Sequence, residues 1–112
     1  MLTLSAYGAS LSYLDGDTHT AVVFSKDEAT LSREGAYSLR LSLKEGETRL
    51  GSLGINSEFG EVLVKTRLLR YSIQKDSLLA SMKYDLDFGV DTQEMQLRIY
   101  AKTLKTEGKN ET

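Results

Sequence analysis

Apolar and polar residues alternate along most of the chain with a period of two. In the clearest run every second residue is apolar: Leu78, Ala80, Met82, Tyr84, Leu86 and Phe88. The same alternation runs through residues 36–44 and 94–103. A strand sends alternate side chains to opposite faces, whereas a helix would scatter these residues around its circumference. The pattern therefore predicts β-strands with one buried face.

Turn-forming sequences separate these runs, for example Asp15-Gly16-Asp17, Glu34-Gly35, Glu45-Gly46 and Gly89-Val90-Asp91. The runs predict about eight strands, at residues 2–7 running on to 10–14, 18–24, 28–33, 36–44, 48–56, 61–73, 78–88 and 94–103. Connections this short join antiparallel strands, because parallel strands need a longer crossover. We therefore expect the strands to follow one another as a meander.

The alternation changes phase within the run 61–73. One face carries Val62, Val64, Thr66 and Leu68, and then Leu69, Tyr71 and Ile73 take it over. A β-bulge or sharp coil at Leu68–Leu69 would reconcile the two halves. A similar slip is predicted between Leu50 and Leu53, near Gly51 and Gly54. Such bends favour an all-β, antiparallel up-and-down barrel over a sandwich, with room inside for side chains or one small ligand.

The length of 112 residues suits one domain. We assign residues 1–104 to the barrel and residues 105–112, which are polar, to a disordered C-terminal tail. The net charge of −2 argues against binding to nucleic acid or to an anionic membrane surface. The absence of cysteine excludes disulfides and thiolate metal sites and fits a reducing compartment. Because no signal peptide or membrane span is evident either, we expect a cytoplasmic protein.

Single polar residues offer few candidates for chemistry. His19 is the only histidine, and it is interpreted as a surface residue at a hairpin end rather than a ligand of a metal or haem. Two pairs of aspartates have the spacing of residues that share one strand face, Asp15 with Asp17 and Asp85 with Asp87. We interpret them as turn-forming residues and solubilising outer-face charge rather than an acid/base pair. The sequence thus predicts no catalytic residue, no metal site and no cofactor.

Arginines and tyrosines are the stronger candidates for binding. Together with Arg33, the residues Arg40, Arg67, Arg70 and Arg98 could form an anion-binding patch, but we favour the interpretation that they pair across strands with Glu61 or Glu94 at the surface. Arg33 differs, because it shares the parity of Ala29 and Leu31 and is predicted to point inward, where it would need a carboxylate or several carbonyls. Tyrosines combine an apolar ring with a polar tip, which suits either a core or the lining of a ligand cavity. The predicted lining comprises Tyr13, Arg33, Tyr71 and Tyr84.

Several short motifs follow one another along residues 11–101. They are the turn Arg33-Glu34-Gly35 leading into Leu39, Leu41 and Leu43, the turn Glu45-Gly46, the turn Phe59-Gly60-Glu61 leading into Val62–Thr66, and Tyr84-Asp85-Leu86 followed by Leu97-Arg98-Ile99. Through them the chain resembles the YwiB-like family of small bacterial proteins, whose barrels are grouped with the calycins, the lipocalin-like barrels. The resemblance implies a barrel of eight or more strands and no particular activity.

Members of that family carry further strand material before the segment that matches Tyr7 to Leu14. We therefore expect an incomplete edge at the start of this barrel and a homodimer that pairs through it. The leading functional hypothesis is a non-enzymatic module that binds a small apolar or amphipathic ligand in the barrel. The alternative is a structural or interaction protein with a filled barrel, acting through a homodimer or partner interface. An interior cavity would favour the first hypothesis, and a solid core with an exposed apolar patch the second.

Overall fold

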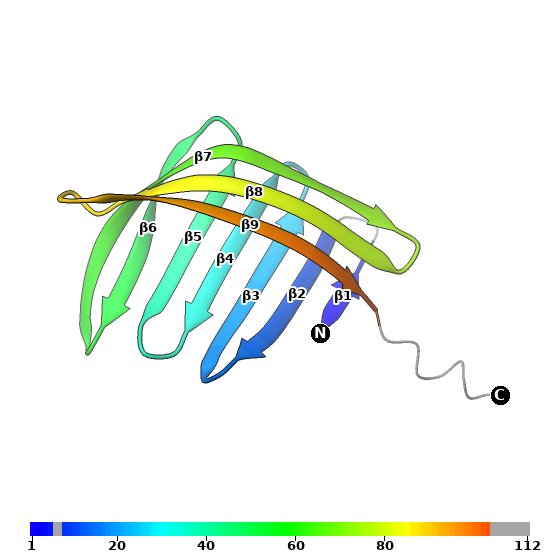
Figure 1. The fold of residues 1–112 in the computed structure, drawn as a ribbon, viewed down its shortest axis with the longest axis horizontal. Coiled ribbons are helices and arrows are strands. Elements are labelled where there is room, and N and C mark those ends of the chain that lie inside the picture. The colour runs from blue at the N-terminus through cyan, green and yellow to red at the C-terminus, as the bar shows by residue number, and fades with distance from the viewer. Residues whose placement is uncertain (6–7, 104–112) are drawn as a thin grey trace.

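The computed structural model describes residues 1–5 and 8–103, which form a nearly closed up-and-down barrel (Figure 1). Nine strands follow one another, each antiparallel to its neighbour in sequence: β1 (Leu2–Leu4), β2 (Gly8–Asp15), β3 (Thr18–Ser25), β4 (Glu28–Glu34), β5 (Ser38–Lys44), β6 (Thr48–Ile55), β7 (Glu58–Gln74), β8 (Ser77–Asp87) and β9 (Thr92–Lys102). The predicted fold class is confirmed. The predicted tail at 105–112 lies outside the described residues.

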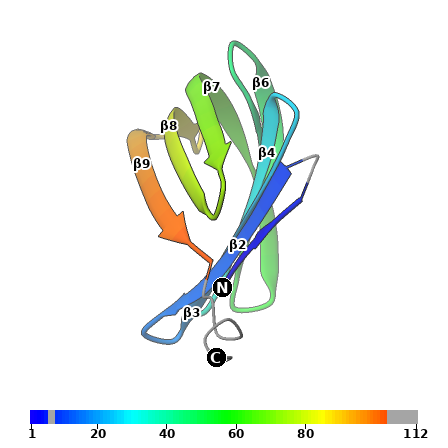
Figure 2. The same cartoon turned by 90° about the vertical axis from the view of Figure 1, so that its right-hand side faces the viewer.

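The sheet folds over itself, so that its two ends form two layers. Figure 1 shows the long strands β7, β8 and β9 crossing over the strands β2 to β6, and Figure 2 shows the two layers from the side. Among the described residues β1 and β9 do not pair, which leaves these two strands as the edges of the sheet. No helix in the described ranges is long and apolar enough to cross a lipid bilayer.

The first predicted strand is wrong, because it consists of two strands. Residues 2–4 form β1, which turns back and pairs with residues 9–11 of β2. The Ser5 N–H donates to the Gly8 carbonyl oxygen at 3.0 Å across this turn. A Cβ on Gly8 would stand 1.9 Å from the Phe24 carbonyl oxygen, so glycine is required where β2 passes β3. The nine observed strands differ from the predicted eight for this reason.

The bend predicted in β7 is present, but it lies just before the predicted position, Leu68–Leu69. The register between β7 and β8 shifts between Thr66 and Leu68. The turn between β5 and β6 holds this bend: the Gly46 N–H donates to Thr66 O, and the Leu69 N–H donates to the Glu45 carboxylate at 2.9 Å. The bond from the Leu69 N–H, and after it the Arg70 guanidinium beside the carboxylate, keep the pKa of Glu45 below its ordinary value.

The slip predicted between Leu50 and Leu53 is wrong. β6 pairs with β7 in continuous register from Thr48 to Ile55. Leu50 is 61% exposed and points away from the core, while Gly51 occupies the inward position beside it. The apparent change of phase came from an exposed leucine, which is an ordinary surface residue in a folded protein.

The core is built from rows of side chains that run across the strands. In β2 to β5 one row contains Ala9, Phe24, Ala29 and Leu43, and the next contains Leu11, Val22, Leu31 and Leu41. From the opposite layer, β8 contributes Leu78, Met82 and Leu86. Phe24, Val22 and Leu43 are 0–1% exposed, so side chains fill this part of the interior.

Candidate functional site

The third row of the interior is polar, unlike the two rows beside it. Tyr13, Thr20, Arg33 and Leu39 lie directly opposite one another across β2, β3, β4 and β5. Directly opposed residues send their side chains to the same face of a sheet. Since Thr20 and Leu39 are buried, this face is the inner one, and Arg33 therefore points inward as predicted.

Two further tyrosines join this row at the end of the barrel where β4 turns into β5. Tyr37 lies in that turn and has the inward parity of Leu39, and Tyr84 reaches in from β8 in the opposite layer. Burial raises the pKa of the Tyr84 phenol; the Arg33 charge lowers it, and the phenols of Tyr13 and Tyr37 raise it. The side chains thus lie within electrostatic reach of one another. We call Tyr13, Thr20, Arg33, Tyr37 and Tyr84 the polar end.

The polar end contains donors that have no partner. Thr20 Oγ1 and Arg33 Nε are both buried, and neither has a hydrogen-bond partner among the described residues. No carboxylate of the described chain lies within ion-pair distance of Arg33. A buried donor without a partner costs about 1–3 kcal/mol, and most buried polar groups in proteins are satisfied. The polar end is therefore an exception that calls for a functional explanation.

Tyr71, the fourth predicted lining residue, lies elsewhere. Its ring packs on Phe24 with 4.9 Å between ring centroids, and its hydroxyl donates to the Lys26 carbonyl oxygen at 2.7 Å. Phe24 and Thr20 are four residues apart on β3, which separates them by about 13 Å. Three of the four predicted residues thus gather at the polar end, whereas the hydroxyl of Tyr71 is held at the other end of the interior.

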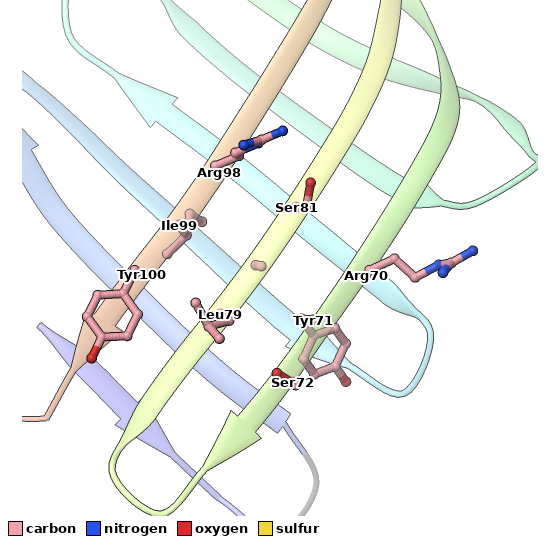
Figure 3. Close-up of a pocket in the computed structure, with 9 residues that line it drawn as sticks. Arg70, Tyr71, Ser72, Leu79, Ser81, Arg98, Ile99 and Tyr100 are labelled. Atoms are coloured by element: carbon pink, nitrogen blue, oxygen red, sulfur yellow. The ribbon is translucent and has the colours of Figure 1, made fainter.

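A second candidate site lies on the outside, across β7, β8 and β9. This outer groove has a volume of about 590 Å³. Two outward rows line it, Ser72 with Leu79 and Tyr100, and Arg70 with Ser81 and Arg98 (Figure 3). Leu79 and Tyr100 are 46% and 63% exposed. The groove is an open depression on the surface of the sheet and not an interior cavity.

Three of the remaining candidate arginines have acidic partners, although the predicted partners, Glu61 and Glu94, are not among them. Arg40 pairs with Glu34 at 3.6 Å and Arg70 with Glu45 at 3.3 Å. Arg67, at the bulge of β7, bonds to Asp85 at 2.8 Å. The interpretation of Asp85 as solubilising charge is wrong, because this residue is 8% exposed and lies under the arginine.

The other acidic candidates and the histidine do not assemble a site. His19, Asp15 and Asp17 are exposed at the hairpin between β2 and β3, and the Asp87 carboxylate accepts the Gly89 N–H at 2.8 Å. Within the described part of the chain, no three histidine, cysteine, aspartate or glutamate side chains are grouped so that they could hold a metal ion.

Comparison with known proteins places the chain in a family. A family model described as "Domain of unknown function (DUF1934)" matches residues 7–101. The chain belongs to this family. No curated protein and no solved structure matches it. The match covers strands β2 to β8 and nearly all of β9, and so includes both candidate sites.

Sequence reasoning missed three parts of these sites in the DUF1934 domain: Thr20, Tyr37 and the outer groove. Tyr37 has the parity of Leu39, which was the signal that it faces inward. Thr20 shares its parity with Val22 and Phe24, so a polar residue on an apolar face was a signal that could have identified it. The outer groove had no such signal. Leu79 and Tyr100 are far apart in sequence, and only the register of β8 with β9 brings them together.

Proposed function

We propose that this DUF1934 domain is a binding module for a small amphipathic molecule that carries an anionic group. Arg33 at the polar end is the residue that would contact the anion. The observation that carries the proposal is its guanidinium, which points inward, is partly buried and has neither a carboxylate nor a hydrogen-bond partner among the described residues. An arginine in such a position is suited to a carboxylate or phosphate, which it binds through two parallel bonds.

The surrounding residues support an amphipathic ligand rather than a simple ion. Tyr13 and Tyr37 are 39% and 38% exposed, so they stand between the interior and solvent and offer apolar ring faces beside the charge. Thr20 adds a hydroxyl without a partner. The two apolar rows behind the polar end are filled, which argues against the ligand deep inside the barrel that an interior cavity would have favoured. The proposal therefore places the ligand at the end of the barrel, where Arg33 has no partner among the described residues.

Calorimetric titration with decanoate and with decanol, its uncharged analogue, tests the proposal. A hydrogen-bonded contact between a guanidinium and a carboxylate is worth about 1.5–3 kcal/mol, which corresponds to about 10- to 150-fold in affinity. We expect decanoate to bind more tightly than decanol by this factor, and Arg33→Gln to remove the difference.

Arg40→Gln is the matched control, since Arg40 lies on β5, faces outward and is exposed. This variant should bind decanoate as the parent chain does. Arg98→Gln distinguishes binding at the polar end from binding in the outer groove, because Arg98 lines the outer groove. If decanoate binds at the polar end, this variant should also bind it as the parent chain does. Equal affinities for decanoate and decanol, or equal loss in the Arg33 and Arg40 variants, would refute an anion site at the polar end.

A further inference from the structure

The last strand of the barrel has one side without a partner. β9 pairs with β8 over its whole length of 11 residues, and among residues 1–5 and 8–103 no strand pairs with its other side. Figure 2 shows β9 at the border of its layer. The other edge strand, β1, has 3 residues and offers little to pair with. A long unprotected edge is a template for another strand.

The inner face of β9 is incompletely covered. Met95, Leu97 and Ile99 are only half-buried, although they pack against the core. Their direct neighbours on β8 are Tyr84, Met82 and Ala80, all of which are buried. A further strand beside β9 would bury these apolar side chains in the same way that β9 covers those of β8.

The outer face of β9 carries three charged residues, Glu94, Arg98 and, at the end of the strand, Lys102. Neither Glu94 nor Arg98 makes an ion pair within the described part of the chain. Across the strand pair Glu94 faces Asp85, which has its own partner in Arg67, and Arg98 faces Ser81. β8 therefore satisfies neither charge.

We propose that β9 pairs with β9 of a second copy of this chain, antiparallel about a twofold axis through Gln96. In this register, residues equally distant from Gln96 face each other over residues 92–100. Glu94 then lies opposite Arg98 of the partner subunit, and Arg98 opposite Glu94 of the partner subunit, so two ion pairs form on the outer face. On the inner face Met95 lies opposite Leu97 of the partner subunit.

Other registers fit less well. A twofold axis between two residues would place inward side chains opposite outward ones, which the sheet does not permit. An axis through Glu94 or Arg98 would set like charges opposite each other, and an axis through Leu97 would leave Glu94 opposite Tyr100. The register centred on Gln96 joins both charges and keeps the apolar faces continuous. The homodimer that it creates is isologous, as most protein dimers are.

Charge reversal provides the test, by sedimentation equilibrium at low salt. The parent chain should be a dimer. Glu94→Arg and Arg98→Glu should each place like charges opposite each other and weaken the dimer about tenfold or more. An equimolar mixture of these two variants should form a heterodimer, and the double variant Glu94→Arg with Arg98→Glu should recover the homodimer. Glu61→Arg, an exposed position on β7, is the control and should dimerise as the parent does.

A cysteine at the axis tests the register directly. Directly opposed residues in an antiparallel pair have Cα atoms about 4.5–5.5 Å apart, which suits a disulfide. Because the chain has no cysteine, Gln96→Cys should give a covalent dimer under mild oxidation, and Glu61→Cys should not. A monomeric parent chain, a mixture of the charge variants that stays monomeric, or equal cross-linking of the two cysteine variants would overturn the proposal.

Discussion

Replacing Thr20 by valine should make the protein more stable. Thr20 is 2% exposed, and its Oγ1 has no hydrogen-bond partner among the described residues. Folding therefore removes the hydroxyl from water without a replacement bond, at a cost of about 1–3 kcal/mol. Valine has nearly the same shape and the same branching at Cβ, so it fits the position without rotamer strain. The free energy of unfolding should rise by about 1–3 kcal/mol, and Tm by about 4–8 °C for each kcal/mol.

Urea unfolding measured by far-UV circular dichroism is a suitable assay, because the chain has no tryptophan to report fluorescence. The midpoint should move to higher urea while the slope m stays constant, which separates a change in stability from a change in compactness. Thr30→Val is the control: Thr30 is exposed on β4, and its replacement should change stability by no more than about 0.5 kcal/mol. A loss of stability at position 20 would show that Oγ1 makes a bond to the protein and that our account of the polar end is wrong.

The Thr20 variant also tests whether the buried hydroxyl takes part in ligand binding. If the polar end binds an anion as proposed, Thr20→Val should gain stability and bind decanoate more weakly. Thr66 has the same burial and likewise has an Oγ1 without a partner among the described residues, but it lies on β7 opposite Tyr84 and not in the row of Arg33. Thr66→Val should therefore gain stability as well, and it should lose less affinity for decanoate than Thr20→Val in the same titration.

Three further predictions concern the frame of the barrel. Glu45→Gln should lower the free energy of unfolding at neutral pH. Because the pKa of Glu45 in the folded state is below its ordinary value of 4.5, the difference in free energy of unfolding between parent and variant should become smaller as the pH falls below 4.5. Urea unfolding curves recorded at a series of acidic pH values would show this. Gly51→Ala should cost about 1–3 kcal/mol, since a Cβ there would stand 2.8 Å from the Arg40 carbonyl oxygen, and a calorimetric Tm equal to the parent's would contradict this. Leu43→Ala should cost about 2–5 kcal/mol in urea unfolding, because Leu43 is 0% exposed in a filled core.

The fold was largely readable from the sequence, because one face of nearly every strand is buried. In β8 this burial sorts the apolar residues Leu78, Ala80, Met82, Tyr84 and Leu86 onto one face, with Asp85 as the one buried residue of the other face, and the bend in β7 appears as a change of phase. The errors arose where the alternation of buried and exposed residues is not informative. β1 is too short to show a period of two, and the exposed Leu50 looks like an inward-facing residue in the sequence and so suggests a change of phase that is not there.

The candidate site was less predictable, because alternation gives the face of a residue but not its row. Tyr71 and Tyr84 both face inward, yet one lies against Phe24 and the other within reach of Arg33. Rows are set by the register between strands, and register depends on turn geometry that the sequence specifies only loosely. The inward direction of Arg33 followed from parity, whereas its lack of a partner depends on all the strands that surround it.

The strand order of the sheet also has a consequence for how the chain reaches its structure. In the part of the chain that the structure describes, each strand is hydrogen-bonded only to the strands that precede and follow it in sequence. Each pairing therefore closes a short loop, which costs little chain entropy. Folds dominated by such near-neighbour contacts reach the native state faster than sheets assembled from distant segments. We expect the sheet to grow hairpin by hairpin, and the bend of β7 against the turn between β5 and β6 to be the step at which the growing sheet becomes a barrel.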